Sequence, residues 1–192
     1  TRGMSSAASD VYKRQEKVQL VAVSKTKPTN YILEAYLAGQ RIFGENKVQE
    51  LVEKSAVLPD DIQWHMIGHL QSNKVKYIAP FVSLIHAVDS KKLLIEIDKR
   101  ARQHDRVIHC LLQIHIAQES SKFGLSEDEA IELLEMNLAN VSVDGLMGMA
   151  TFTNDKQQIR SEFKSLKNTF EKAKSKFNNC LLYTSPSPRD GL

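Results

Sequence analysis

The chain is short of the features that mark secreted, membrane-spanning and nucleic-acid-binding proteins. Its 192 residues include two cysteines, too few for the disulfide framework of a small secreted domain. No apolar run reaches the roughly 18–20 residues of a membrane-spanning helix, and the start lacks the apolar block of a secretory signal. The 26 basic and 23 acidic residues are too evenly balanced to predict a nucleic-acid partner. These absences predict a cytoplasmic protein that contacts neither a membrane nor nucleic acid.

The signatures of metal and nucleotide sites are missing as well. His104 and His109 have no companion pair at the spacing of a zinc site, so we expect no bound metal. The sequence contains no GxGxxG motif, no Walker loop and no Ser-His-Asp arrangement. Cys110 lies within an apolar run and is predicted to be a buried small side chain. What remains is an ordinary globular composition, 42% hydrophobic and 26% charged, at the length of one domain.

The two ends of the chain differ from its middle. Residues 1–15 have neither helical nor strand periodicity, and residues 180–192 carry a Pro-Ser-Pro cluster that is incompatible with a continuing helix. Both ends resemble translated adapter sequence from assembled sequencing reads. We therefore predict non-native tails at 1–15 and 180–192 around one domain at 16–179.

Within that domain, short apolar runs alternate regularly with helical stretches. The predicted strands are 18–24, 41–44, 62–67, 81–88, 106–116 and 141–149. The predicted helices are 28–38, 45–55, 72–78, 91–103, a segment that begins at Ser126 with Glu129 as its capping box, and 156–176. Regular alternation favours a parallel sheet with right-handed crossovers. The pattern alone leaves two architectures open, an open doubly wound sheet and a (β/α)8 barrel that lacks two units.

Polar residues and glycines gather where the predicted strands end. In both architectures ligands bind at the carboxyl ends of parallel strands. Five such segments follow the strands, at 24–28, 44–46, 65–69, 121–124 and 148–151. Together they favour a binding site at that edge of the sheet over a set of ordinary polar loops.

Lys25 is the strongest candidate for chemistry at this edge. It ends a predicted buried strand, where desolvation favours the neutral amine, and a neutral amine can form a Schiff base with an aldehyde. Lys27 would project to the same side if the strand persisted. Its positive charge would then also favour the neutral form of the Lys25 amine. The residues alone leave open the alternative that both lysines are solvated surface groups. They also leave His65 as either a core histidine or a ligand contact, and Asn46 as either a ligand contact or a helix cap.

Five segments together resemble one known family. VAVSKTKP, AGQRIFGENKVQE, WHMIGHLQSNK, QIHIAQESSKFG and VDGLMGMAT, spread over residues 18–177, are similar to the pyridoxal 5′-phosphate (PLP) homeostasis protein family. That family's fold resembles the N-terminal barrel of alanine racemase. The resemblance implies an α/β fold, a TIM-type (β/α)8 barrel that is incomplete here, with about six β/α units and the last two strands missing.

The resemblance also implies the cofactor and the residues around it. Lys25 matches the lysine that holds PLP as a Schiff base, and three further positions match the lining of the pocket. Two other lysines match positions near the pocket that could accept the aldehyde in transit or guide the phosphate. The implied cofactor-binding residues are Lys25, Lys27, Asn46, His65, Lys122 and Met149.

The C-terminal part of the chain departs from the family pattern. Family members continue with a Met-Gly-Met-Ser-like motif and an Arg-Ile-Gly segment, which grip the cofactor phosphate. Here the chain passes instead into residues 178–192. We therefore expect the full-length parent protein to bind the cofactor, and this chain to bind it weakly or not at all.

The function implied by the resemblance is PLP binding in intracellular PLP homeostasis, without catalytic turnover. The expected partners are the small-molecule cofactor and PLP-dependent apo-enzymes, and the expected state is a monomer. A racemase needs a second acid or base opposite the lysine, and no tyrosine stands in the five strand-end segments. The alternatives are a PLP-dependent amino-acid racemase or decarboxylase, and a cofactor-free Schiff-base aldolase.

Overall fold

The computed structural model describes residues 19–117, 123–176 and 182–184. The predicted tail at 1–15 lies outside the described residues, as does the predicted tail at 180–192 except for 182–184. The strands are β1 (Ala22–Val23), β2 (Ile42–Glu45), β3 (Gln63–Met66), β4 (Leu84–Val88), β5 (Ile108–Gln113), β6 (Val141–Met147) and β7 (Leu182–Thr184). The helices are α2 (Thr29–Leu37), α3 (Val48–Ser55), the 3-10 turn η1 (Ser72–Lys74), α4 (Val75–Ile78), α5 (Lys91–Arg102), α6 (Glu127–Leu134) and α7 (Lys156–Lys176).

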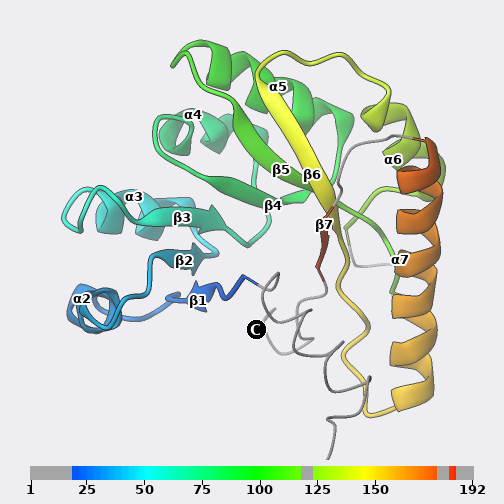
Figure 1. Ribbon diagram of the computed structural model, residues 1–192, viewed down its shortest axis with the longest axis horizontal. Helices are drawn as coiled ribbons and strands as arrows, with labels where there is room; N and C mark the ends of the chain where they lie inside the picture. The colour runs from blue at the N-terminus through cyan, green and yellow to red at the C-terminus, as the bar shows by residue number, and fades with distance from the viewer. Residues whose placement is uncertain (1–18, 118–122, 177–181, 185–192) are drawn as a thin grey trace, which may run out of the picture.

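The strands form one parallel sheet in chain order, β1-β2-β3-β4-β5-β6-β7. Each strand pairs with the next along the sequence, for example Ile42 with Gln63 and Ile108 with Val141. The sheet is curved, and the helices lie along its outer side (Figure 1). Within the described residues β1 pairs only with β2, and β7 only with β6, so the barrel is not closed. The predicted α/β fold of an incomplete TIM-type barrel is confirmed.

Two features of the sheet differ from the sequence prediction. A seventh strand, β7, pairs with β6 in a segment predicted to be a tail. The first strand is much shorter than the predicted 18–24, because only two of its residues pair with β2. The other predicted strands and helices are present, and Ser126 and Glu129 form the expected capping box at the start of α6.

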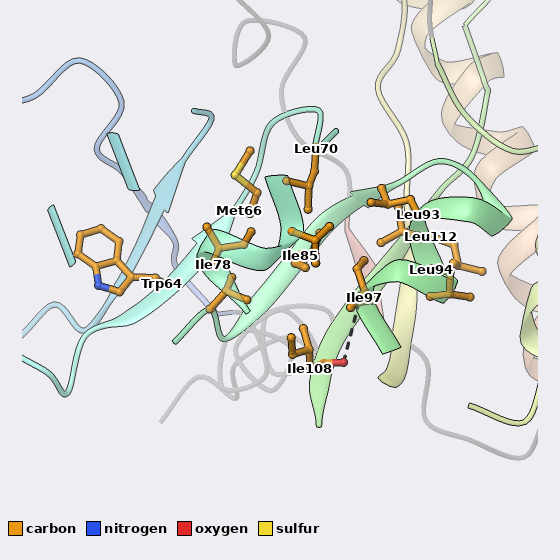
Figure 2. Close-up of a cluster of buried hydrophobic side chains, with 14 of the residues drawn as sticks. Trp64, Met66, Leu70, Ile78, Ile85, Leu93, Leu94, Ile97, Ile108 and Leu112 are labelled. Carbon is orange, nitrogen blue, oxygen red and sulfur yellow. Dashed lines mark hydrogen bonds between the residues drawn. The ribbon is translucent and has the colours of Figure 1, made fainter. Parts of the chain in front are cut away.

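The main core lies between the sheet and the outer helices. Side chains alternate along a strand, so every second residue faces the helices. Trp64 and Met66 of β3 and Ile85 of β4 are buried in one cluster that extends to Leu93 and Leu94 of α5 (Figure 2). Each large apolar side chain buried there contributes about 1.5–3 kcal/mol to folding.

The inner, concave face of the sheet carries a smaller apolar cluster. Ala87 of β4, Leu111 of β5 and Met147 of β6 are buried there, with Leu84 and Met149 packed against them. Strands β4, β5 and β6 therefore carry buried apolar residues on both of their faces.

Candidate functional site

A tight turn carries Lys25 at the carboxyl end of β1. The amide of Lys27 donates a hydrogen bond to the carbonyl oxygen of Ser24 at 3.0 Å. Thr26 has a φ of +62°, the left-handed value that the third residue of a type II turn requires. Lys25 is half-buried, whereas Lys27 is exposed. The strand ends before Lys25, so the alternation that would place Lys25 and Lys27 on one side does not apply.

A cavity of about 350 Å³ opens near the carboxyl ends of the neighbouring strands. Its lining combines apolar side chains with amide, imidazole and ammonium groups. Its lining residues are Asn46, Lys47, Ile67, Gly68, His69, Ala87, Gln113, Phe123 and Met149. Most of them follow β2, β3 and β6 directly, in the strand-end segments that the sequence predicts to form a site.

Asn46 lines this cavity and does not cap a helix. The residue that precedes α3 is Lys47, and it makes no side-chain cap hydrogen bond. Asn46 also lies close to the backbone of Gly68, because a Cβ atom at position 68 would come within 2.5 Å of the Asn46 carbonyl oxygen. Glycine at position 68 therefore lets the ends of β2 and β3 approach each other at the cavity.

His69 forms part of the cavity wall together with Phe123. The two rings stack with their centroids 4.8 Å apart and their planes 23° apart. The Nδ1 atom of His69 lies 3.0 Å from a carboxylate oxygen of Asp89, which orients the imidazole. The cavity thus contains an imidazole that is held by a carboxylate.

Gln113 is a buried polar residue at the end of β5. Its Nε2 atom donates a hydrogen bond to the carbonyl oxygen of Phe123 at 2.8 Å. The sequence analysis did not select Gln113, His69 or Phe123 individually. The signal for Gln113 was present, since it is a polar residue directly after the apolar residues Cys110–Leu112 of β5.

His65 contacts a second histidine on the concave face of the sheet. Its Nδ1 atom lies 3.0 Å from Nε2 of His86, and His65 is almost fully buried. Burial lowers the pKa of His65 to about 4. Burial, together with the charge of His65, lowers the pKa of His86 to about 3. Both rings are therefore neutral at pH 7, and one donates its ring hydrogen to the other.

The six residues predicted to bind a cofactor fall into three groups. Asn46 and Met149 line the cavity. Lys25, Lys27 and His65 are not among its lining residues, and Lys25 lies at the end of the strand next to β2. Lys122 lies outside the described residues.

Two kinds of feature are absent from the part of the chain that the structure describes. None of its helices combines the length and the apolar character needed to cross a membrane. The same residues contain no group of three or more His, Cys, Asp or Glu side chains that could hold a metal ion.

Comparison with known proteins gives consistent matches over most of the chain. The family described as alanine racemase, N-terminal domain, matches residues 7–186. A pyridoxal phosphate homeostasis protein from Aquifex aeolicus is 37% identical over 170 residues, which cover 87% of this chain and 75% of that protein. Another with this name, from Vibrio alginolyticus, is 40% identical over 158 residues, 79% of this chain and 68% of that protein.

The solved structures point the same way. PipY of Synechococcus elongatus, solved without PLP, has a TM-score of 0.80 and 32% identity, covering 91% of this chain and 85% of PipY. A second structure of PipY has PLP bound, with a TM-score of 0.76 and 31% identity over the same shares of the two chains. Alanine racemase from Clostridium difficile has a TM-score of 0.69 at 9% identity over 88% of this chain and 46% of the racemase, so it supports the fold alone.

Proposed function

The chain belongs to the pyridoxal phosphate homeostasis protein family, and from this premise we propose that it binds PLP through Lys25 and serves intracellular PLP homeostasis. The relatives from Aquifex aeolicus and Vibrio alginolyticus are named pyridoxal phosphate homeostasis protein, and the related PipY has a structure with PLP bound. We further propose that it acts without catalytic turnover, as a cytoplasmic monomer whose recipients are PLP-dependent apo-enzymes.

The observation that supports the proposal is that Lys25 follows β1, the strand next to β2, whose following residue Asn46 lines the cavity. β1 pairs with β2 in parallel, so the residues that follow these two strands reach the same edge of the sheet. Lys25 and a cavity of small-molecule size therefore lie at the same edge of the sheet, the edge where barrel proteins bind ligands.

The residues present fit an aldehyde cofactor. The Lys25 amine would hold PLP through a C=N bond to the aldehyde carbon that the cofactor would supply, with the aldehyde oxygen lost as water. Aromatic Phe123 and apolar Met149 suit a flat ring, and the amides of Asn46 and Gln113 can bind its polar substituents.

The first test asks where the cofactor becomes attached. Because the C-terminal part of the chain departs from the family pattern, binding is expected to be weak, so the protein is mixed with a large excess of PLP. It is then reduced with sodium borohydride and digested, and the modified lysine is identified by mass spectrometry. We expect the reduced adduct on Lys25, and its loss in Lys25→Ala. Lys99→Ala, which changes an exposed lysine of α5, is the matched control and should keep the adduct. Attachment to another lysine, or to none, would overturn the proposal.

A racemase-like enzyme is the second candidate, and one observation favours it. The imidazole of His69, oriented by Asp89, gives the cavity a group able to transfer protons. With PLP and an amino acid in deuterated buffer, exchange of the α-proton would establish this alternative, and its absence would support a role without turnover. Borohydride trapping of a small keto compound on Lys25 in the absence of PLP would instead indicate an aldolase.

A further inference from the structure

The backbone on both sides of Lys25 is held by side chains of one helix, α3. The carbonyl oxygen of Ser24 accepts a hydrogen bond from the Nζ atom of Lys54 at 2.8 Å. The amide of Thr26 donates a hydrogen bond to Oε1 of Glu50 at 2.8 Å. Lys54 and Glu50 are one helical turn apart and form an ion pair of 2.6 Å. The turn that carries Lys25 is thus attached to α3 at the residue before the lysine and at the residue after it.

The hydrogen-bonding capacity of Lys54 is fully used at this point. Its ammonium group has three hydrogens, and these reach the Ser24 carbonyl, Glu50 and, at 2.7 Å, Glu45 of β2. Glu45 is completely buried and also accepts a hydrogen bond from the Ser24 hydroxyl at 2.6 Å. Both bonds to Glu45 go to Oε1, and Oε2 of Glu45 is buried without a hydrogen-bond partner among the described residues. The bonds that Lys54 and Glu45 make to Ser24 restrict how these three residues can be arranged. They therefore fix the position of Ser24 relative to β2 and α3.

The conformation of Thr26 requires such support. A φ of +62° is unfavourable for a β-branched residue and persists only where the surroundings enforce it. The bond from the Thr26 amide to Glu50 provides part of that enforcement. Although burial opposes it, hydrogen bonds from Lys54 and from the Thr26 amide hold the pKa of Glu50 below its usual value, so the carboxylate stays charged near pH 7.

We propose that Glu50 and Lys54 are positioning residues for Lys25. They act behind the sheet, on its helix-covered side, and hold the turn in the conformation that presents the Lys25 amine to an aldehyde. This inference rests on the proposed role of Lys25. It adds that the reactivity of the lysine depends on two α3 side chains outside the cavity lining.

The test measures the order of the turn and the reactivity of Lys25 separately. The first readout is the exchange rate of the Thr26 amide hydrogen in the protein without PLP, measured by NMR. The second is the rate at which added PLP becomes trapped by borohydride on Lys25. In Glu50→Ala we expect Thr26 exchange to rise by roughly tenfold, which corresponds to one lost hydrogen bond. Trapping on Lys25 should slow by roughly ten- to a hundredfold, since misplaced reacting groups lose rate steeply.

The controls keep a role in folding distinct from a role in positioning. Glu53→Ala removes an exposed carboxylate of the same helix and should leave both readouts unchanged. Amide exchange in β5, in the core, should be unchanged in Glu50→Ala. Lys54→Met should also slow trapping but lowers folding stability as well, so Glu50→Ala is the decisive variant. Lys54→Arg should retain part of the trapping rate, because arginine can still donate to the Ser24 carbonyl.

The outcomes distinguish this inference from the proposed function. Normal trapping on Lys25 together with wild-type rates in Glu50→Ala would overturn the positioning role alone. No trapping on Lys25 in the unsubstituted protein would overturn the proposed function, and the positioning role with it. Faster Thr26 exchange with slower trapping on Lys25 would support both.

Discussion

The carboxylate of Glu162 accepts two hydrogen bonds from Thr151, one from the backbone amide at 2.6 Å and one from the hydroxyl at 2.7 Å. Glu162 belongs to α7, and Thr151 lies in the loop that follows β6. Glu50 of α3 binds the amide of Thr26, after β1, in the same way. At two strand ends, therefore, a helix carboxylate on the outer side fixes the loop that borders the candidate site.

Replacement of Glu162 by alanine should destabilise the protein. The change removes a charged acceptor and leaves the amide and hydroxyl of the buried Thr151 without this hydrogen-bond partner. The free energy of unfolding should fall by about 2–3 kcal/mol. Urea unfolding followed by circular dichroism measures this free energy. Glu171→Ala, at an exposed position of the same helix, should change it by no more than about 0.5 kcal/mol. Equal effects of the two variants would contradict the importance of the Glu162–Thr151 contacts.

Replacement of Lys54 by methionine should cost more, because Glu45 would lose the cation that compensates its buried charge. Breaking a buried ion pair from one side typically costs about 3–5 kcal/mol. The midpoint and slope of urea unfolding provide the measurement. Lys99→Met on α5 is the control, with an expected change within about 0.5 kcal/mol. A loss below about 1 kcal/mol in Lys54→Met would contradict the importance of the buried Lys54–Glu45 pair.

The buried pair His65 and His86 should make the protein less stable in mild acid. Both pKa values lie below the ordinary 6.5, at about 4 and about 3, so between pH 6.5 and 4 the unfolded chain binds more protons than the folded one. Stability is therefore complete above about pH 6.5 and falls as the pH decreases from there. For His65 alone the loss amounts to roughly 3 kcal/mol by pH 4.

The free energy of unfolding at pH 7, 6 and 5 tests this dependence, since ordinary carboxylates contribute little to it above about pH 5. His86→Asn should flatten the decline relative to the unsubstituted protein. His104→Asn, at an exposed histidine, should leave the slope as it is. A decline of equal slope in all three proteins would rule out the buried pair as its source.

The capping box of α6 should contribute measurably to stability. The Ser126 hydroxyl accepts the amide hydrogen of Glu129 at 3.2 Å, and the Glu129 carboxylate accepts the amide hydrogen of Ser126 at 2.8 Å. Ser126→Ala should therefore cost about 1 kcal/mol. Ser161→Ala, in the exposed interior of α7, should have the opposite sign and a size of a few tenths of a kcal/mol, because alanine favours helix. Thermal unfolding of the two variants compares them directly.

A side chain at position 68 should disturb the cavity. In Gly68→Ala the new Cβ atom would come within 2.5 Å of the Asn46 carbonyl oxygen, so the backbone must move, at a cost of about 1–3 kcal/mol. At Gly44 the nearest atoms are side-chain atoms of Ile67 and Val21 at 3.1 Å, which can rotate away. Gly44→Ala should therefore be the milder change in urea unfolding. The reverse order would contradict the tight approach of Asn46 and Gly68.

Much of the fold was predictable because its signals are local. Buried parallel strands appear as short apolar runs, and the start of α6 is marked by Ser126 and Glu129 three residues apart. The strand β7 was not predictable, since its three residues lie in a segment whose composition resembles a tail. The short β1 was also missed, because pairing with β2, rather than apolar character, decides where that strand ends.

The candidate site was predictable only in part. Asn46 and Met149 followed from strand ends and from the family resemblance, and both line the cavity. The contact between Lys54 and Ser24, thirty residues apart, depends on how α3 is seated against β1 and β2, which no local pattern encodes. Likewise, the approach of His65 to His86 depends on the pairing of β3 with β4.

The two-residue strand β1 has a consequence for how the molecule opens. It is hydrogen-bonded to one neighbour within the described chain, and Val23 in it is 42% exposed. Strand edges of this kind open at far lower free energy than the centre of a sheet. Transient fraying would therefore reach the loop with Lys25 while β3, β4 and β5 stay folded. Lys25 follows this edge strand, so fraying that breaks the bonds to Glu50 and Lys54 would release the cofactor before the centre of the sheet unfolds, and the release would report early denaturation.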